Sequence, residues 1–400
     1  MTSKRLDFHA WVVLSLNALY TIANALCSIF VGVYFWKNSL DFTVVCYHYL
    51  ALFLVTPVVF LLAGWYSQAR DRVHVFRLGL ALHAVFYACL LYLGEDSPRY
   101  APHLGALLGV TWGFFWAGNN TFNFDVAKPE NRDYYFGWLG AINGAARLAA
   151  PMAGGLLIGL APDAEHGYQL IFFLAVLIYG AGIVLSAWVP ADSTRRPFRL
   201  KRALFPGRDQ HDWQWVMLAA VTLAGSFNIF HFLLALVMYM QTSNEVTVGG
   251  FAAFQALAAI VTSYLLGRLI VPRQRRTAML WGVILLVTAG VLISAKLTVF
   301  TLVVFGFLRS VAQPLFSIPH WGVRFESIDR CAEDPSQRIE YLSAWEVPLA
   351  IGRVLMIGLL AILYETLGDT GMRIALFLLC ANRILTYLCL IQISSLRREP

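Results

Sequence analysis

The sequence predicts an all-α polytopic membrane protein, with twelve transmembrane helices in two parallel six-helix halves. Three observations predict this class: an apolar composition, a series of long apolar segments and an internal repeat. Apolar residues make up 59% of the 400 residues and charged residues 13%, with a mean hydropathy of +0.64. Soluble domains carry about 25% charged residues, so the composition indicates a chain that is largely embedded in lipid.

Twelve segments are long enough to cross a bilayer, which takes about 20 apolar residues in a helix. Helices also satisfy their own backbone hydrogen bonds in lipid. The first segment follows Lys4 and Arg5 and continues to Phe35. It is too long for the apolar core of a signal peptide, so we expect a retained helix. The predicted spans are residues 9–36, 42–66, 76–94, 101–125, 134–160, 168–189, 213–241, 246–271, 277–295, 298–322, 340–366 and 371–395.

The basic residues predict how these spans are oriented. With the N-terminus inside, 22 of the 30 lysines and arginines fall on cytoplasmic segments and 4 on external ones. This bias follows the positive-inside rule and predicts that both termini lie in the cytoplasm. We expect the protein in the plasma membrane. The net charge of +7 therefore reflects topology, and we expect no nucleic-acid partner. The remaining 4 basic residues lie inside spans: Arg147, Arg309, Arg353 and Arg383.

A repeat of 206 residues relates the fifth and eleventh spans. Arg147 corresponds to Arg353 and Tyr135 to Tyr341, and a nearby offset of 201 pairs Asp125 with Glu326. Both copies follow an even number of spans, so they share one orientation, as in transporters that bind substrate between two halves. The basic stretch 190–212 separates these halves. The predicted domains are a six-helix bundle at 1–189, a cytoplasmic linker at 190–212 and a second bundle at 213–400.

Two short motifs carry a resemblance to the major facilitator superfamily, whose uncharacterised bacterial members the chain resembles overall. The loop after the second span contains Asp71-Arg72 and then Arg77, and resembles the Gly-x-x-x-Asp-Arg-x-Gly-Arg-Arg signature of the family, with Ser67 in place of its first glycine. The fifth span resembles the antiporter motif of the family at Gly137, Ala146, Ala150, Pro151, Gly154 and Gly155. The resemblance implies that Asp71, Arg72, Arg77 and Asp125 form a cytoplasmic gate, and that Pro151, Gly154 and Gly155 let the fifth span pack closely and bend. It also implies that the first, fourth, seventh and tenth spans line a central cavity.

Polar and aromatic residues recur at spacings of three to four along those same four spans, which places each set on one helical face. We expect them to bind the substrate. Interhelical hydrogen bonds and aromatic packing remain an alternative reading for each of them. The substrate-binding candidates are Asn17, Tyr20, Asn24, Trp112, Trp116, Asn119, Asn228, His231, Arg309, Gln313, Ser317 and His320.

Placing an arginine at the centre of a membrane-spanning helix costs about 2.5–3.5 kcal/mol of insertion free energy. Arg147 and Arg353 each lie 12 residues past the tyrosine near the start of their span, about 18 Å along a helix and close to the midplane. Because the repeat makes them equivalent, we expect a structural role at the seam between the halves. We expect Arg309, rather than Arg147 or Arg353, to bind an anionic or zwitterionic substrate. Glu346 shares a helical face with Arg353, two turns away, and we expect it to be too far for direct contact.

These features predict a secondary active transporter that moves a small organic solute by alternating access, with efflux by proton antiport as the leading mode. Glu346, His231 and His320 are the candidates for proton coupling. No phosphate-binding loop of the Gly-x-x-x-x-Gly-Lys-Ser/Thr kind occurs, so ATP is not expected to drive transport. The alternatives are an uptake symporter or facilitator for an anionic metabolite, and a non-transporting membrane sensor. The sequence contains no Gly-x-Ser-x-Gly or His-Glu-x-x-His motif, so we do not expect an enzyme. The six cysteines form no Cys-x-x-Cys pair, so we expect no metal site. We also expect no cofactor, and a monomeric protein whose partners are the solute, protons and lipid.

Overall fold

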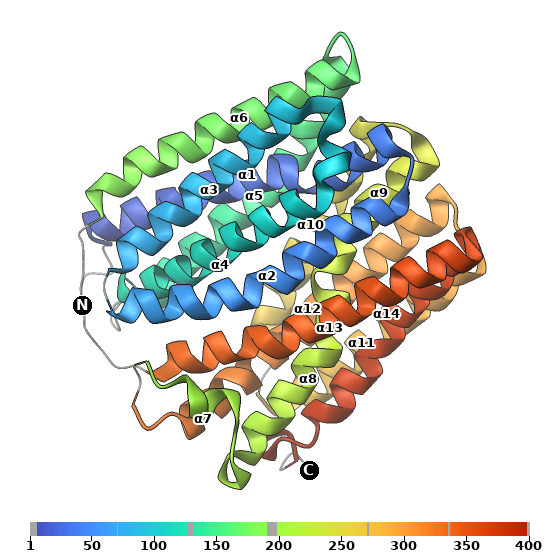
Figure 1. Cartoon of the computed structure of the whole chain (residues 1–400). Coiled ribbons are helices and arrows are strands. Elements are labelled where there is room, and N and C mark those ends of the chain that lie inside the picture. Colours follow the sequence, from blue (N-terminus) through green and yellow to red (C-terminus); the bar gives the residue numbers. More distant parts are fainter. Residues whose placement is uncertain are drawn as a thin grey trace. The chain divides into compact units, whose positions relative to one another are not determined.

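The computed structural model describes residues 6–69, 71–126, 131–189, 198–269, 272–334 and 337–397. These residues are almost entirely helical, and none of them forms a strand, which confirms the predicted all-α class (Figure 1). The long helices are α1 (Phe8–Ser39), α2 (Phe42–Ala69), α3 (Arg72–Leu93), α4 (Ala101–Val126), α5 (Arg132–Leu160), α6 (Ala164–Leu185), α8 (His211–Phe227), α9 (Ile229–Thr242), α10 (Glu245–Leu269), α11 (Arg275–Ala295), α12 (Val299–Cys331), α13 (Arg338–Leu367) and α14 (Asp369–Leu390). Two short helices, α7 (Leu200–Leu204) and α15 (Ser394–Arg397), complete the set of α-helices in the described residues.

The chain divides into two compact units. The first comprises Met1–Phe198 and Asn244–Ala253, and the second comprises Arg199–Ser243 and Phe254–Pro400. The first unit therefore contains α1–α6 and the beginning of α10, and the second contains the other helices. Residues 200–210, which belong to the predicted linker, include α7 and fold with the second unit, where the Trp213 indole donates to the Ala203 carbonyl over 2.8 Å.

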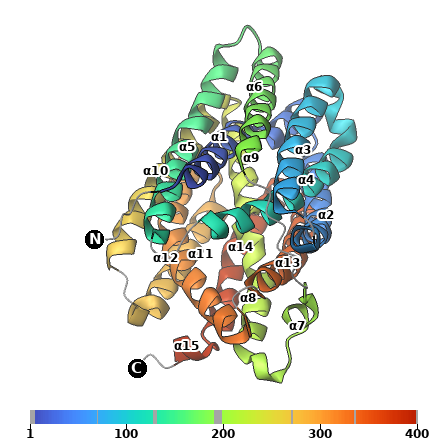
Figure 2. The same ribbon diagram turned by 90° about the vertical axis from the view of Figure 1, so that its left-hand side faces the viewer.

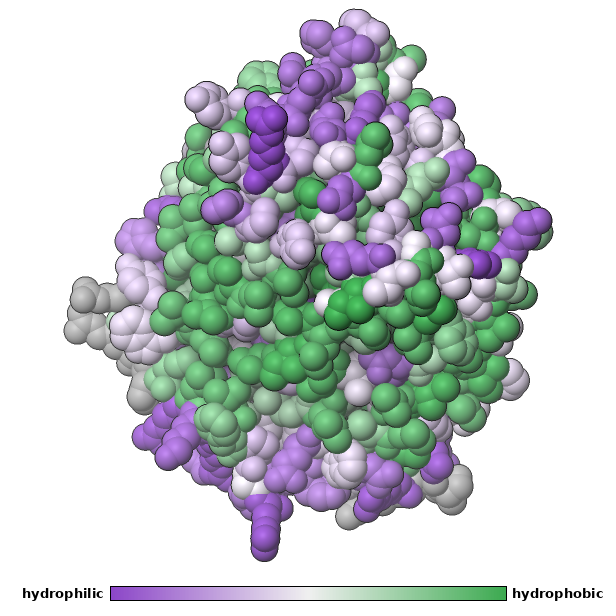
Figure 3. Space-filling view, turned by 45° about the vertical axis from the view of Figure 1, so that its right-hand side comes forward, coloured by the Kyte–Doolittle hydropathy of each residue, from purple (hydrophilic) through white to green (hydrophobic). Residues whose placement is uncertain are grey.

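Apolar helices long enough to span a membrane account for most of the described chain. By length and composition there are eleven such stretches among the described residues, and one of them, Arg72–Asn120, contains α3 and most of α4. Hydrophobic side chains gather over the middle of the face drawn in Figure 3, and hydrophilic ones gather toward its upper and lower ends. The protein is therefore a multi-pass membrane protein.

The predicted seventh span is not one helix. It divides at Asn228 into α8 and α9, where the sequence Gly225-Ser226 precedes the break. Glycine and serine weaken the local helical ladder and are frequent at sharp bends. The His231 amide then bonds back to the Asn228 carbonyl over 3.2 Å. A search for apolar runs does not detect this break, because hydropathy stays high through it.

Backbones come unusually close where α5 meets its neighbours in the first unit. A Cβ placed on Gly154 would lie 2.6 Å from the Leu26 carbonyl oxygen of α1, and one on Gly155 would lie 2.5 Å from the Glu245 carbonyl oxygen of α10. On α10, a Cβ on Gly249 would lie 2.4 Å from the Pro151 carbonyl oxygen. Small residues permit this kind of helix contact in membranes. The first turns of α10, which belong to the first unit, lie beside α5 in Figure 2.

Candidate functional site

In the first unit, part of the predicted polar stripes forms a buried hydrogen-bond network. Tyr135 donates its hydroxyl proton to the Asn123 Oδ1 atom over 2.6 Å, and the Asn17 amide donates to the same oxygen over 3.4 Å. Asn123 in turn donates to the backbone carbonyl of Asn119 over 2.9 Å. The network joins α1, α4 and α5. Asn119 Oδ1 is buried and has no hydrogen-bond partner among the described residues.

The aromatic candidates of the first unit lie in a packed cluster. The Tyr20 ring stacks on Phe115 with ring centroids 3.6 Å apart, and it meets Trp116 edge-on at 5.7 Å and His83 edge-on at 5.2 Å. This geometry is typical of aromatic packing in protein interiors. Trp112, one turn before Trp116, faces Phe53 at 6.5 Å. Asn24 is half-buried on α1.

The residues of the predicted gate have local structural partners in the first unit. Asp71 is the N-cap of α3, where its carboxylate accepts from the Val73 amide over 2.7 Å. Arg77 joins α3 to the end of α6, donating to the Ser186 hydroxyl oxygen over 3.1 Å and to the Ser186 carbonyl over 2.8 Å. Arg72 is buried, and the side chain of Asp125 lies outside the described residues. In the second unit, the repeat counterpart of Asp125 is Glu326, which accepts from Arg275 over 2.5 Å.

The capping role makes Asp71 a sharp test of the predicted gate. Asparagine caps helices as well as aspartate does, whereas alanine at an N-cap costs about 1 kcal/mol. Asp71→Asn is therefore expected to leave thermal stability and substrate affinity unchanged while slowing the transport cycle, because only the charge is lost. Asp71→Ala is expected to lower stability as well. Melting temperature, equilibrium binding and transport rate of the two variants would separate these effects, and a large loss of affinity in Asp71→Asn would refute a gate role.

Arg147 and Arg353 correspond in the repeat, but their surroundings differ. Arg147 is exposed on α5, whereas Arg353 is 4% exposed on α13. Arg353 donates to the Glu346 carboxylate over 3.3 Å. The expectation that Glu346 is too far for direct contact is therefore wrong. The first half has no equivalent acid, because Gly140 occupies the position that corresponds to Glu346.

Side-chain direction explains how the ion pair spans two turns. Side chains of a helix lean toward its N-terminus, so the long Arg353 side chain reaches back over the turn that carries Glu346. Pro348 lies between them in α13, and a proline inside a helix removes one backbone hydrogen bond and bends the axis. An estimate from axial rise alone neglects both effects.

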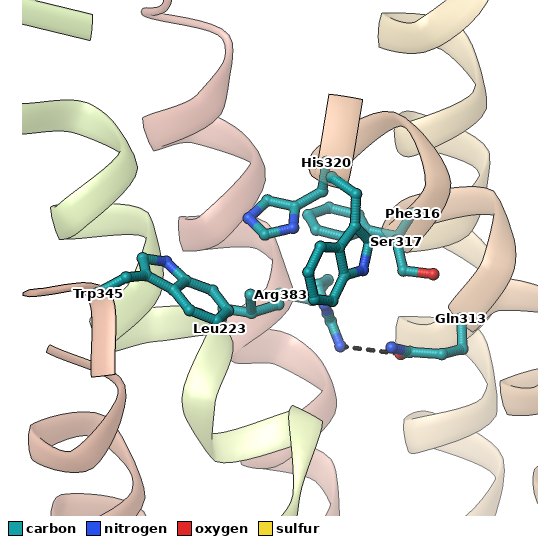
Figure 4. A pocket seen from close by; sticks show the side chains of 8 residues that line it. Leu223, Gln313, Phe316, Ser317, His320, Trp345 and Arg383 are labelled. Atoms are coloured by element: carbon teal, nitrogen blue, oxygen red, sulfur yellow. Dashed lines mark hydrogen bonds between the residues drawn. The ribbon is translucent and has the colours of Figure 1, made fainter. Parts of the chain in front are cut away.

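A pocket in the second unit collects several polar candidates. It is a narrow crevice that is too tight to hold a water molecule, and the empty space between its lining atoms amounts to about 220 Å³ when adjoining open solvent is included. Gln313, Ser317 and His320 of α12 line it, as the polar stripe predicts for one helical face. The other lining residues were not candidates: Leu223, Phe316, Trp321, Trp345 and Arg383. Figure 4 shows these side chains converging from α8, α12, α13 and α14.

Two buried arginines lie at this pocket, Arg383 in its lining and Arg324 against two of its tryptophans. Arg383, which is 1% exposed, donates from Nη2 to Gln313 Oε1 over 3.2 Å (Figure 4) and lies 4.6 Å from the Phe316 ring centroid. Arg324, which is 2% exposed, lies 4.0 Å from the ring centroids of both Trp321 and Trp345. Guanidinium groups over aromatic faces are stabilised by cation–π attraction, more strongly where water is excluded. These contacts stabilise the guanidinium groups of Arg324 and Arg383 in the apolar interior.

The other candidates of the second unit lie outside the lining of this pocket. Arg309, half-buried on α12, donates to Gln255 over 3.5 Å and lies 5.1 Å from the Phe230 ring centroid. Its charge is nevertheless near enough to Arg383 for the two to repel. Asn228 marks the break between α8 and α9, and His231 is exposed on α9.

Sequence reasoning missed Arg383, although a signal was present. The residue interrupts the apolar run LFLLCANRILTYLCL, and a charge at that depth has the same insertion cost that drew attention to Arg309. Helical periodicity did not select Arg383, because α14 carries no polar stripe and lies outside the four cavity spans of the family pattern. Trp321 and Trp345 carry no such signal, because tryptophan is common in apolar spans.

Comparisons with known proteins agree with this architecture. A family model described as the Major Facilitator Superfamily matches residues 11–318. The uncharacterized protein YqgE of Bacillus subtilis (strain 168) is 27% identical over 376 residues, which are 94% of this chain and 87% of that protein. The tetracycline resistance protein, class B, of Escherichia coli is 30% identical over 131 residues, which are 32% of this chain and 30% of that protein.

Two groups of solved structures share the fold. The inward-facing structure of a bacterial homologue of the iron transporter ferroportin superposes with a TM-score of 0.70 at 17% identity, covering 96% of this chain and 98% of that one. The peptide transporter POT in complex with sulfate superposes with a TM-score of 0.74 at 12% identity, covering 98% of this chain and 96% of that one. At these identities the likeness concerns the fold alone.

Proposed function

Because the chain belongs to the Major Facilitator Superfamily, a family of membrane transporters, we propose that it is a secondary active transporter that exports a small, anionic or amphipathic organic solute by alternating access in exchange for protons. The observation that carries this proposal is the group of arginines on the helices of the second unit, at and near a pocket with an aromatic lining. Arg383 lines the pocket and Arg324 packs on its two tryptophans, whereas Arg309 lies outside the lining. Glu346 is an acid that attracts Arg324.

Charge balance favours an anionic solute. Glu346 already bonds to Arg353 over 3.3 Å and also attracts Arg324, so this carboxylate is shared between two guanidinium groups. Charged groups inside a membrane protein that face a cavity mark ion or substrate pathways. An anionic solute would offset the positive charge that the arginines leave in this part of the second unit.

Export is favoured over import by two further points. The antiporter-like pattern of α5 corresponds in the structure to close backbone contacts at Gly154 and Gly155. In addition, one relative is a tetracycline resistance protein, a name that implies protection against a compound. Uptake of an anionic metabolite by symport or facilitated diffusion is the second candidate, favoured by the same excess of arginines. We place the protein in the plasma membrane as a monomer. The 22-to-4 distribution of basic residues supports cytoplasmic termini.

Substrate discovery and transport can be joined in one experiment. Purified protein would be screened by thermal shift against charged and neutral metabolites and drugs, since a ligand present at 100 times its Kd stabilises the folded state by about 2.7 kcal/mol. Each hit would then be tested for flux in proteoliposomes with an imposed pH gradient. Anionic hits with protein-dependent, gradient-driven flux would support the proposal. Hits that bind but never cross would favour a sensor.

Arg309 provides a residue-level prediction for the same assay. Removing one charge-assisted contact costs about 1.5–3 kcal/mol, so Arg309→Ala is expected to weaken binding of an anionic hit about tenfold or more. Arg309→Lys, which keeps the positive charge, is expected to lose less. Unchanged affinity in Arg309→Ala, measured by isothermal titration calorimetry, would remove this residue from the substrate site.

A further inference from the structure

The pocket of the second unit is surrounded by buried nitrogen donors that lack acceptors. Arg383 Nε, Arg383 Nη1, Arg324 Nε and Trp345 Nε1 are all buried and have no hydrogen-bond partner among the described residues. Each N–H group is a donor only, and a buried donor left unsatisfied costs about 1–3 kcal/mol. Three of these donors belong to residues that line the pocket, and the fourth lies on Arg324, which packs against two lining tryptophans. Such a group of donors suits a ligand rich in acceptor oxygens.

The contact that Arg383 makes in this structure is a weak substitute for such a ligand. Its hydrogen bond goes to the amide oxygen of Gln313, a neutral acceptor, over 3.2 Å. A guanidinium group binds a carboxylate or sulfonate through two parallel bonds, which are stronger than one bond to a neutral group. An oxyanion that reached Arg383 would therefore displace Gln313 and also satisfy the Nε or Nη1 donor.

The rest of the lining is flat and aromatic. Phe316, Trp321 and Trp345 surround the crevice together with the ring of His320. Ring centroids of His320 lie 6.2 Å from those of both Phe316 and Trp345. Such walls favour a planar ring, which can stack against them or meet them edge-on. In this structure the crevice has no space wide enough for a water molecule, so a solute enters only if the lining side chains move apart, and a single ring requires less movement than a larger solute.

We propose that this pocket binds a compact aromatic anion, with the carboxylate or sulfonate held by Arg383 and the ring packed among Phe316, Trp321 and Trp345. The proposal rests on the transport function above and names the substrate class of that function. It moves the main anionic contact from Arg309 to Arg383, with Arg309 as a second positive charge nearby.

Three probes separate the two parts of this recognition. Benzenesulfonate carries both the ring and a permanent charge, benzenesulfonamide carries the ring without the charge, and methanesulfonate carries the charge without the ring. Calorimetry on the purified full-length protein is expected to show benzenesulfonate binding at least about tenfold more tightly than either of the others, which corresponds to 1.4 kcal/mol. Equal binding of benzenesulfonamide would overturn the role of the charge, and equal binding of methanesulfonate would overturn the role of the ring.

Two variants then place the site. Arg383→Gln is expected to weaken benzenesulfonate binding about tenfold or more, whereas Arg373→Gln, at the other end of the same helix, is expected to leave it unchanged. If Arg383→Gln does not fold, Gln313→Glu gives an independent test. It would place a carboxylate beside Arg383, so it is expected to raise the melting temperature and to block benzenesulfonate. Undiminished binding by either folded variant would refute the site.

Binding and transport give separable outcomes. If benzenesulfonate does not bind but another solute from the screen shows protein-dependent flux, the pocket assignment fails and the transport function stands. If benzenesulfonate binds as expected and neither it nor any other hit crosses the membrane, the transport function fails and the pocket assignment stands.

Discussion

Gly155→Leu is expected to lower the melting temperature and to abolish transport. A Cβ at this position would lie 2.5 Å from the Glu245 carbonyl oxygen, so a leucine side chain would force α5 away from the first turns of α10. Extra side-chain volume in a packed interface costs about 1–3 kcal/mol. The effect here belongs at the upper end of that range, because the obstructing atom is backbone and cannot rotate aside.

The same helix supplies a matched control for this substitution. Gly140 also lies on α5, and a Cβ placed there would meet nothing within 4 Å. Gly140→Leu is therefore expected to retain the melting temperature of the parent protein. Thermal unfolding of both variants by tryptophan fluorescence would compare them directly. Equal stability of the two would show that the close approach of α5 and α10 contributes nothing to the fold.

Glu346→Gln is expected to reduce pH-driven flux to the level of protein-free vesicles. Glu346 lies in a membrane-spanning helix with its side chain 19% exposed, and it pairs with Arg353 over 3.3 Å. A carboxylate that can exchange its arginine partner for a proton is suited to couple proton movement to a conformational change. Glutamine keeps the shape and removes the titration. Solute exchange without a gradient is expected to persist.

The ion pair requires its own control, because the loss of a carboxylate beside a buried arginine can destabilise the protein by about 3–5 kcal/mol. The double variant Glu346→Gln, Arg353→Gln removes both charges and should recover stability without recovering coupling. Glu365→Gln, at the exposed end of the same helix, should behave like the parent. Gradient-driven flux that survives in Glu346→Gln, or returns in the double variant, would exclude Glu346 as the coupling acid.

The architecture could be predicted from the sequence because the bilayer imposes it. Lipid demands about 20 apolar residues per helix, and the distribution of arginines and lysines then orients the spans. What hydropathy does not determine is where a helix stops: α12 continues to Cys331, and the seventh span divides at Asn228. Both depend on local backbone partners, which an apolar window does not detect.

The candidate site was only partly predictable. Helical periodicity placed Gln313, Ser317 and His320 on one face, and they line one pocket. Periodicity along one helix cannot show which residue of another helix completes that face, so Arg383 and Trp345 were missed. The repeat had a similar limit, because it related Arg147 to Arg353 but did not indicate that Arg353 pairs with Glu346.

Flux through reconstituted protein tests the central claim most directly. Proteoliposomes and protein-free vesicles would be compared for movement of labelled benzenesulfonate and of each hit from the thermal-shift screen, with and without a pH gradient. A proton-coupled transporter predicts protein-dependent flux of at least one solute, accelerated by the gradient and saturable with concentration. Flux no faster than in protein-free vesicles for every solute that binds, under either condition, would contradict a transport function.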